Sequence, residues 1–207
     1  MLKSSSLTLE TKGNLPEKIY LVDNFLTPSE CDLLIELAAP LLAPSTTVID
    51  GVRQPNPWRT SYSAYLRINH ELIDQIYEKA AEMLNTEAVF FEDLQCTSYK
   101  TSQEFRAHYD AFNTGNSEEI LRYGQRKSTL LIYLNDDFDG GETDFPLLKA
   151  RIPPKKGRAI IWDNMLTSSL RDEESLHAGL PVTNGQKYVC NLWLRDKVQE
   201  RNARKHH

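Results

Sequence analysis

The sequence contains no long hydrophobic run and few cysteines, and each absence excludes a class of protein. No stretch of its 207 residues approaches the roughly 18 consecutive apolar residues that cross a bilayer, so we expect no membrane association. The first residues lack the apolar core of a secretory signal peptide, which favours a cytoplasmic location. Cys31, Cys96 and Cys190 are widely spaced and form no C-x-x-C pair, so we expect buried free thiols, not disulfides or a thiolate zinc site.

The sequence also lacks an excess of basic charge. The chain has 24 Lys+Arg against 29 Asp+Glu, a net charge of −5, and no basic run, which argues against a nucleic acid partner. The length corresponds to one domain, at about 150 residues per domain. We expect a flexible leader over residues 1–17, a single domain over 18–196 and a charged tail over 197–207. Within that tail, His206 and His207 are interpreted as exposed terminal residues.

Two helices are predicted in the first 90 residues. The segment Thr27-Pro-Ser-Glu30 offers an N-cap, a proline in the first turn and a capping-box glutamate, so a helix begins there and runs to about Leu42. A second helix, over about 70–85, is expected to be capped by Asn69. Residues 43–58, between them, contain three prolines and a glycine, which favours a long flexible loop.

From residue 90 onward the segments are short, apolar or alternating, and separated by turn residues, which indicates a β-rich domain. Leu130–Leu134 and Ala159–Trp162 are apolar on both alternations, as in a sheet that is covered on both faces. The predicted fold class is therefore α+β and mainly β: a sandwich or barrel core over about 90–195, with helical support over about 27–85 packed outside it. The expected strands are 19–22, 60–68, 93–100, 104–109, 128–134, 149–152, 158–163, 174–178 and 186–195.

A candidate metal site comes from three polar residues in the β-rich part. His108 and Asp110 are two apart on a predicted strand, so their side chains project to the same face. A His-x-Asp pair alone is more often a hydrogen-bonded structural pair. With His177, on another predicted strand, it completes the facial triad that holds non-haem Fe(II) and leaves coordination positions open for a 2-oxo acid and dioxygen. No fourth ligand for a structural zinc site is evident.

Lys187 begins the last predicted strand, and alternation puts five residues on one face: Lys187, Val189, Asn191, Trp193 and Arg195. If that face lines the interior, the ammonium is buried and needs an anion. The distal carboxylate of 2-oxoglutarate would be such an anion. The alternative is a lysine that reaches solvent from the start of the strand.

The order of the motifs resembles that of the prolyl 4-hydroxylases, a family of Fe(II)- and 2-oxoglutarate-dependent oxygenases. The likeness covers nearly the whole chain and is fainter upstream, at Arg59-Thr-Ser61. The matching elements are Tyr99, His108-x-Asp110, Tyr133-Leu-Asn-Asp, Gly140-Gly-Glu-Thr-Asp-Phe-Pro146, Lys156-Gly157, Ser175-Leu-His177, Gly179-x-Pro181, Gly185-x-Lys187 and Asn191-x-Trp193-x-Arg195.

The resemblance implies a double-stranded β-helix, or jelly roll. In it His108, Asp110 and His177 would bind iron. Lys187 would pair with the distal carboxylate of 2-oxoglutarate, with help from the hydroxyls of Tyr99 and Thr143. The cofactors implied are Fe(II), 2-oxoglutarate, dioxygen and ascorbate as reductant, and the partner is a proline-containing peptide or protein.

The resemblance also implies a peptide groove lined by Arg126, Trp193 and Arg195, with mobile segments at about 45–58 and 112–126 closing over it. Tyr99 and Trp193 could instead pack in the core, and the two arginines could be solvated strand ends. The chain departs from the family pattern at Phe105, where many relatives carry tyrosine, and at Arg195, where collagen-type enzymes tend to carry histidine. Both departures leave the identity of the substrate peptide open.

Two alternative functions share parts of this pattern. A sister oxygenase that acts on lysine or on a free amino acid would use the same metal and cosubstrate residues and differ in its loops. A jelly-roll peptide-binding module without catalysis would normally have a broken triad or lack the lysine, and this sequence has neither defect.

Overall fold

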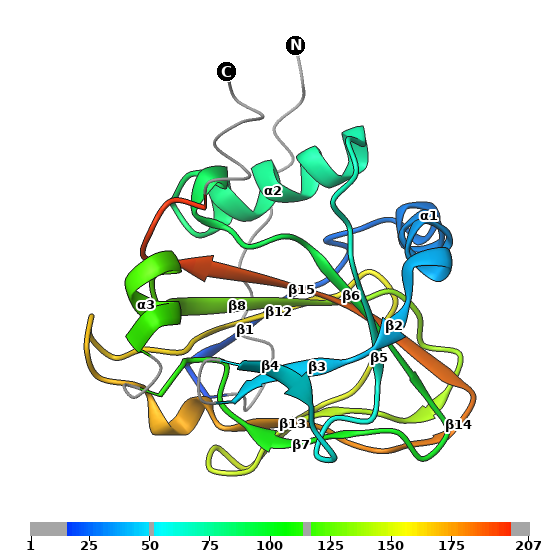
Figure 1. Ribbon diagram of the computed structural model, residues 1–207. Helices are drawn as coiled ribbons and strands as arrows, with labels where there is room; N and C mark the ends of the chain where they lie inside the picture. The colour runs from blue at the N-terminus through cyan, green and yellow to red at the C-terminus, as the bar shows by residue number, and fades with distance from the viewer. Residues whose placement is uncertain (1–15, 50–51, 114–116, 200–207) are drawn as a thin grey trace.

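The fold consists of two facing antiparallel sheets with helices on the outside of one of them (Figure 1). The structure is a computed structural model that describes residues 16–49, 52–113 and 117–199. The expected leader and tail therefore lie largely outside the described residues, as do His206 and His207. No helix in the described ranges is long and apolar enough to span a membrane.

The larger sheet has seven strands and the smaller sheet has four. In spatial order the larger sheet contains β1 (Ile19–Val22), β12 (Ala159–Asp163), β8 (Arg126–Tyr133), β15 (Gln186–Arg195), β6 (Gln95–Lys100), β5 (Tyr62–Tyr65) and β2 (Ala43–Pro44). The smaller contains β11 (Ala150–Ile152), β10 (Thr143–Phe145), β13 (His177–Gly179) and β7 (Phe105–His108). Two ribbons complete the strands, β14 (Val182–Asn184) with β9 (Asp139–Gly140), and β3 (Thr46–Ile49) with β4 (Val52–Pro55). The mainly β fold class and the jelly roll are confirmed.

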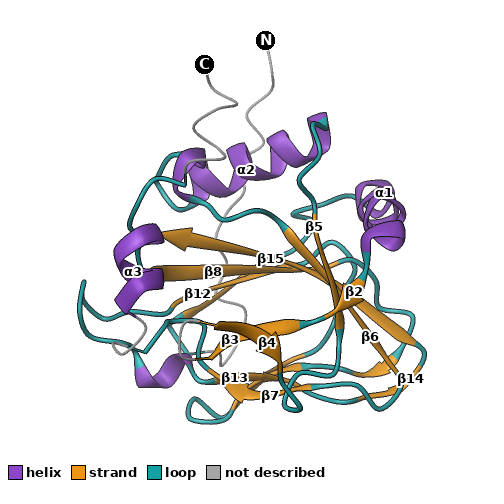
Figure 2. Ribbon diagram, in the orientation of Figure 1, coloured by secondary structure: helices purple, strands orange, loops and turns teal. Residues whose placement is uncertain are grey.

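Helices α1 (Pro28–Ala38) and α2 (Glu71–Met83) cover the outer face of the larger sheet (Figure 2). The capping box of α1 forms as predicted, with Thr27 and Glu30 exchanging hydrogen bonds, and a short 3₁₀ turn, Ala39–Leu41, follows the helix. The predicted cap of α2 is wrong: His70, not Asn69, caps it, because its Nδ1 accepts a hydrogen bond from the amide of Leu72. Further short helices are Ala88–Phe90, α3 (Ser117–Tyr123) and Glu173–Ser175.

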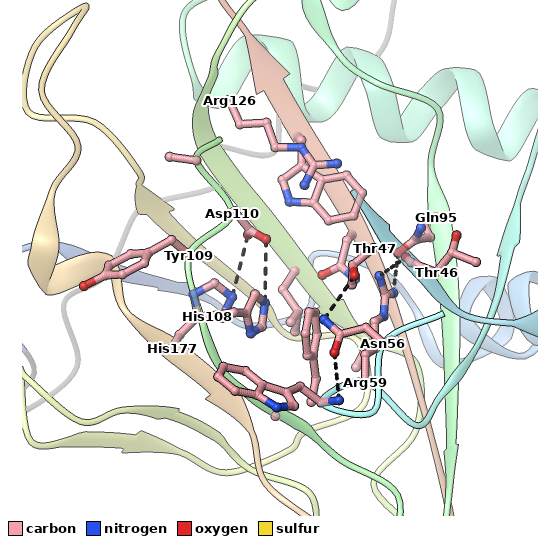
Figure 3. Close-up of a pocket in the computed structure, with 18 of the residues that line it drawn as sticks. Thr46, Thr47, Asn56, Arg59, Gln95, His108, Tyr109, Asp110, Arg126 and His177 are labelled. Atoms are coloured by element: carbon pink, nitrogen blue, oxygen red, sulfur yellow. Dashed lines mark hydrogen bonds and ion pairs between the residues drawn. The ribbon is translucent and has the colours of Figure 1, made fainter. Parts of the chain in front are cut away.

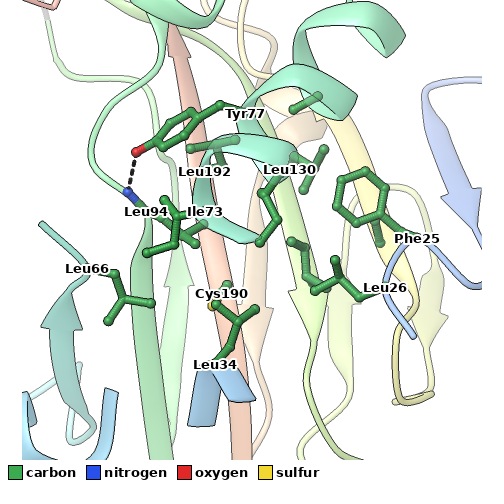
Figure 4. Close-up of a cluster of buried hydrophobic side chains, with 14 of the residues drawn as sticks. Phe25, Leu26, Leu34, Leu66, Ile73, Tyr77, Leu94, Leu130, Cys190 and Leu192 are labelled. Atoms are coloured by element: carbon green, nitrogen blue, oxygen red, sulfur yellow. Dashed lines mark hydrogen bonds between the residues drawn. The ribbon is translucent and has the colours of Figure 1, made fainter. Parts of the chain in front are cut away.

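Alternate residues of the central strands serve two separate cores. Leu130 and Ile132 of β8 point toward the helices and join the core that Figure 4 shows. Leu131 and Tyr133 of the same strand point between the two sheets and join a second core. This double coverage is the reason why β8 is apolar on both alternations, and it confirms that prediction. All three cysteines are buried free thiols, as expected.

The long loop expected over 43–58 is wrong for most of its described residues. They form β2 and the paired strands β3 and β4, in which Thr46 lies opposite Pro55. A proline is tolerated in a two-stranded ribbon where its nitrogen faces the outer edge, because no partner strand there requires the N–H group that proline lacks. The short elements α3, β9, β10 and β14 were also not anticipated, since segments of two to seven residues have too little periodicity to be recognised.

Candidate metal centre and cosubstrate pocket

A pocket of about 270 Å³ opens between the two sheets and contains most of the residues expected at the active site. The residues with chemical or recognition potential that line it are Arg59, Gln95, Tyr99, Phe105, His108, Tyr109, Asp110, Glu119, Arg126, Thr143, His177, Lys187, Asn191 and Trp193. A pocket of this size is comparable with the smaller ligand sites of proteins, about 300 Å³ and above. Lys187, Val189, Asn191 and Trp193 all line it, so the predicted inner face of the last strand is the pocket face.

His108, Asp110 and His177 converge at one end of the pocket (Figure 3). Their ligand atoms all lie within 4.8 Å of one another. The Nε2 atom of His108 is 3.8 Å from Oδ1 of Asp110, and that of His177 is 3.7 Å from Oδ2. Three donors at these separations can coordinate one cation.

The fold brings the two histidines together through strand pairing. His108 is the last residue of β7 and His177 the first of β13, and the two are directly opposite in the antiparallel register. Asp110 lies just beyond the end of β7, so its approach to His108 depends on the bend after the strand and not on strand alternation. The expected reason for the His-Asp proximity was therefore wrong, although the proximity itself is present.

Main-chain carbonyl groups fix the tautomer of both imidazoles. Nδ1 of His108 is 2.8 Å from the carbonyl oxygen of Arg106, and Nδ1 of His177 is 2.9 Å from that of Ser175. Because a carbonyl only accepts, each Nδ1 carries the proton and each Nε2 is left with its lone pair. Both lone pairs therefore belong to the atoms that face Asp110.

The electrostatics of the cluster suit a divalent cation. Burial, followed by the neighbouring His177, lowers the pKa of His108 to about 3, so the ring is neutral near pH 7. Burial alone would raise the pKa of Asp110, but the neighbouring imidazoles, Arg126 and the Thr129 hydroxyl outweigh it and lower this pKa to about 2. Two imidazoles and one carboxylate form the donor set that favours Fe(II) with open positions.

Lys187 lies deeper in the same pocket and has no carboxylate partner among the described residues. It is 2 % exposed, and its ammonium donates to the carbonyl oxygen of Gly141 at 2.7 Å. The rings of Tyr99 and Tyr133 lie 5.2 and 5.3 Å from its Nζ. Burial lowers the pKa of Lys187 to about 7. The charge of Glu142 opposes this shift but forms no ion pair with Lys187 among the described residues, so the direct contacts of the buried cation are neutral and it can bind an anion.

A glycine is required beside this lysine. Gly141 has φ +66°, and a Cβ there would come within 2.9 Å of the Phe138 ring and 3.1 Å of Lys187 Cδ. The Gly140-Gly141 motif therefore lets the chain pass close to the lysine stem.

The two predicted hydroxyl partners of Lys187 line the pocket, and each has a polar neighbour. The Thr143 hydroxyl lies 2.6 Å from that of Tyr133, and Ser61 acts on the Tyr99 hydroxyl in the direction that lowers its pKa, against the effect of burial. Burial raises the pKa of Tyr99, so its hydroxyl stays protonated. The supporting role of Tyr133 was not predicted, because its strand is apolar on both faces and the tyrosine was interpreted as part of a motif only.

The structure divides the three residues predicted for the peptide groove. Arg126 and Trp193 line the pocket, with the guanidinium of Arg126 stacked 3.7 Å above the indole. Arg195 does not line it. It is 3 % exposed and lies under α3, where it pairs with Glu92 and Glu119 and donates to the carbonyl oxygen of Gly124.

Arg59 is a pocket residue to which the sequence assigned no role. It is 9 % exposed, its pKa is lowered by burial, and among the described residues it has only neutral acceptors. These acceptors are the side chains of Ser61, Ser63, Gln95 and Thr97 and the carbonyl oxygen of Thr46. The guanidinium lies 4.9 Å above Phe105, whose ring stacks on His108 with centroids 3.5 Å apart.

Comparison with known proteins defines the class. A family model described as the 2OG-Fe(II) oxygenase superfamily matches residues 94–195, which include the metal cluster, Lys187 and most of the pocket. The fold and the site are those of this class, in which a jelly roll holds ferrous iron and 2-oxoglutarate.

Relatives that match most of the chain show to which family within this superfamily it belongs. Prolyl 4-hydroxylase 5 of Arabidopsis thaliana is 34 % identical over 197 residues, covering 83 % of this chain and 66 % of the relative. Prolyl 4-hydroxylase 1 of the same plant is 32 % identical, covering 87 % and 70 %. The crystal structure of a viral collagen prolyl hydroxylase from Paramecium Bursaria Chlorella virus-1, in complex with 2OG, is 35 % identical with a TM-score of 0.70, covering 86 % of this chain and 96 % of that one. The chain therefore belongs to the prolyl 4-hydroxylase family.

Proposed function

We propose that this protein is an Fe(II)- and 2-oxoglutarate-dependent dioxygenase that hydroxylates C4 of a proline residue in a peptide or protein. One observation carries the proposal: a His-Asp-His cluster and a buried ammonium without a carboxylate partner share a single pocket. The names of the relatives support proline as the target.

His108, Asp110 and His177 would hold the iron, since their donor set fits it and their Nε2 atoms are unprotonated. When bound there, iron supplies the activation of dioxygen that is coupled to oxidative decarboxylation of 2-oxoglutarate to succinate and carbon dioxide, with ascorbate as the reductant. The chain's own contribution is to hold the donors, anchor the cosubstrate and orient the peptide.

Lys187 would bind the distal carboxylate of 2-oxoglutarate. This ion pair would compensate the ammonium and the carboxylate for the hydration that both lose on binding. The ammonium is buried, and its acceptor without the ligand is the neutral carbonyl group of Gly141. The hydroxyls of Tyr99 and Thr143 can donate to the same carboxylate, since both side chains line the pocket with Lys187. The contact with Tyr133 keeps the Thr143 hydroxyl in place before the ligand enters.

Arg126 and Trp193 would orient the peptide. Among the described residues, Glu92 takes the Nε and Nη2 donors of Arg126, which leaves Nη1 for a ligand. The indole N–H of Trp193 is buried and has no protein partner in the described ranges. Both residues line the pocket, and an unmet buried donor such as this indole N–H favours a ligand that supplies an acceptor, such as a carbonyl group of a peptide.

The proposal is tested by incubating a panel of peptides with the protein, Fe(II), ascorbate and 2-oxoglutarate. We expect one proline-containing peptide to gain the mass of a single oxygen atom, located at C4 by fragmentation, with matching succinate. His177→Ala should abolish both products, and His70→Asn, a substitution at a histidine that caps α2, should retain them. Oxygen found only on lysine peptides or on free amino acids would replace proline as the target. Failure of every substrate to stimulate 2-oxoglutarate consumption would contradict the assignment.

A further inference from the structure

The three metal-binding side chains are oriented by outer hydrogen bonds of two kinds. Main-chain carbonyl groups hold His108 and His177, so no substitution can remove those contacts. Asp110 is different, because the hydroxyl of Thr129 donates to its Oδ2 at 2.7 Å. The support of the carboxylate is therefore a side chain, and it can be removed without changing a ligand.

Thr129 is itself held by a second buried side chain. Nδ2 of Asn164 donates to Oγ1 of Thr129 at 2.9 Å, and the two residues are 0 % and 1 % exposed, respectively. A threonine hydroxyl has one proton, and Thr129 uses it in the hydrogen bond to the Asp110 carboxylate. The other partner of this hydroxyl must therefore be a donor. The amide of Asn164 meets this requirement, whereas a carboxylate at this position would not.

The main chain of Asn164 continues the connection toward His177. The amide of Asp172 donates to the carbonyl oxygen of Asn164 at 3.0 Å. The amide and the hydroxyl of Ser175 both donate to the carbonyl oxygen of Asp172, at 3.1 and 2.7 Å. Ser175 then accepts from Nδ1 of His177. Asn164 thus joins two hydrogen-bond chains, one that ends on Asp110 and one that ends on His177.

We propose that Thr129 and Asn164 are positioning residues that hold the Asp110 carboxylate in place relative to His177 and thereby set the affinity of the site for a divalent cation. The inference rests on the proposed function only in taking Asp110 and His177 as metal ligands. Neither Thr129 nor Asn164 contacts the metal position directly, since both act through Asp110. Loss of such outer partners typically costs about 10–100-fold in metal affinity or activity.

The test measures metal binding and not turnover. Thr129→Val removes the hydroxyl at nearly constant shape, and Thr129→Ser restores it. Asn164→Asp keeps the shape but replaces the donor with an acceptor. The matched control is Ser128→Ala on the same strand, because its hydroxyl donates to Asp163 at 2.6 Å and is not part of either chain. Mn(II) affinity is measured by electron paramagnetic resonance of the free ion, and ligand geometry by the d–d absorption of the Co(II) protein.

We expect Thr129→Val and Asn164→Asp to raise the Mn(II) dissociation constant by about 10–100-fold and to change the Co(II) spectrum. Thr129→Ser should recover most of the affinity, and Ser128→Ala should match the wild type. Wild-type affinity and spectrum in both altered proteins would overturn the inference, whatever their melting temperatures. If Asn164→Asp does not fold, the Thr129→Val and Thr129→Ser pair decides the result. Absence of Mn(II) and Co(II) binding in the wild type would instead contradict the proposed function.

Discussion

At the scale of single residues, Lys187 is the most unusual, because a buried lysine loses its hydration without gaining a carboxylate. Its pKa of about 7 means that the free protein holds the ammonium only partly charged at neutral pH. Binding a dicarboxylate favours the charged form, so binding takes up a proton above pH 7. Affinity for 2-oxoglutarate should therefore fall as the pH rises through and beyond 7.

This pH dependence can be measured by calorimetric titration of the Mn(II) protein with 2-oxoglutarate between pH 6 and 9. We expect the dissociation constant to increase by up to about tenfold per pH unit above 7. Lys187→Met introduces a side chain of similar length without a charge. This variant should bind 2-oxoglutarate about 10–100-fold more weakly at pH 6.5, because a charged hydrogen bond is lost. Its dissociation constant should not rise in the same way with pH. Equal slopes in the two proteins would refute the assigned role of the lysine.

The cluster of His108, Asp110 and His177 and its shared pocket with Lys187 could be predicted from the sequence, because each proposed chemical role requires one kind of side chain. Arg195 could not be placed in the same way. Alternation along the last strand puts it on the same face as Trp193, but α3 covers that end of the strand, and α3 is too short to be recognised from its pattern. Arg59 was missed because its acceptors come from three separate segments.

At the scale of elements, a buried ion cluster ties α3 to the larger sheet. Glu92 accepts from both Arg126 and Arg195, and Arg195 also bonds Glu119 of α3 at 2.8 Å. Burial alone would raise the pKa of Glu92, but the two guanidinium groups outweigh it and lower this pKa below its ordinary value. Through Glu92, the cluster fixes the side chain of Arg126, which lines the pocket.

We therefore expect Glu92→Gln to reduce the free energy of unfolding by about 3–5 kcal/mol, because two buried guanidinium groups lose their shared partner. Urea denaturation at pH 7 measures this change. The comparison is Arg67→Ala, which removes an ion pair whose arginine side chain is 52 % exposed and should cost no more than about 1 kcal/mol. A cost for Glu92→Gln as small as that for Arg67→Ala would contradict the structural role of the cluster.

The same cluster predicts an acid sensitivity. A carboxyl with a lowered pKa stabilises the fold above its unfolded pKa, and this stability is lost as the pH falls through the folded value. The Glu92 contribution is thus complete at neutral pH and disappears in acid. The urea midpoints of the wild type and of Glu92→Gln should therefore converge as the pH is lowered. A constant difference between the two midpoints at every pH would contradict this role of Glu92.

At the scale of the whole molecule, the jelly roll brings together residues that lie nearly 80 positions apart, from His108 to Lys187. A site assembled from both sheets should stabilise the fold when it is filled, because ligands bind only the folded chain. With Mn(II) and 2-oxoglutarate each at 100 times their dissociation constants, we expect about 2.7 kcal/mol per ligand, visible as a rise in melting temperature. Asp110→Ala should show no rise, and a rise of equal size would place the metal elsewhere.

The fold class could be predicted from the sequence because strands whose residues are apolar on both faces must be covered on both sides. Few arrangements of strands and helices provide such coverage. The ribbon of β3 and β4 beside the pocket could not be inferred, since prolines at its edge suggested a loop. The cytoplasmic location stays a prediction.

The proposed reaction can be tested by running it under isotopically labelled dioxygen with a peptide that the panel identifies. If the proposed reaction takes place, hydroxyproline and succinate each receive one labelled oxygen atom, in equal amounts, and His108→Ala forms neither. Label in succinate without label at C4 of proline, or hydroxyproline that takes its oxygen from water, would contradict it.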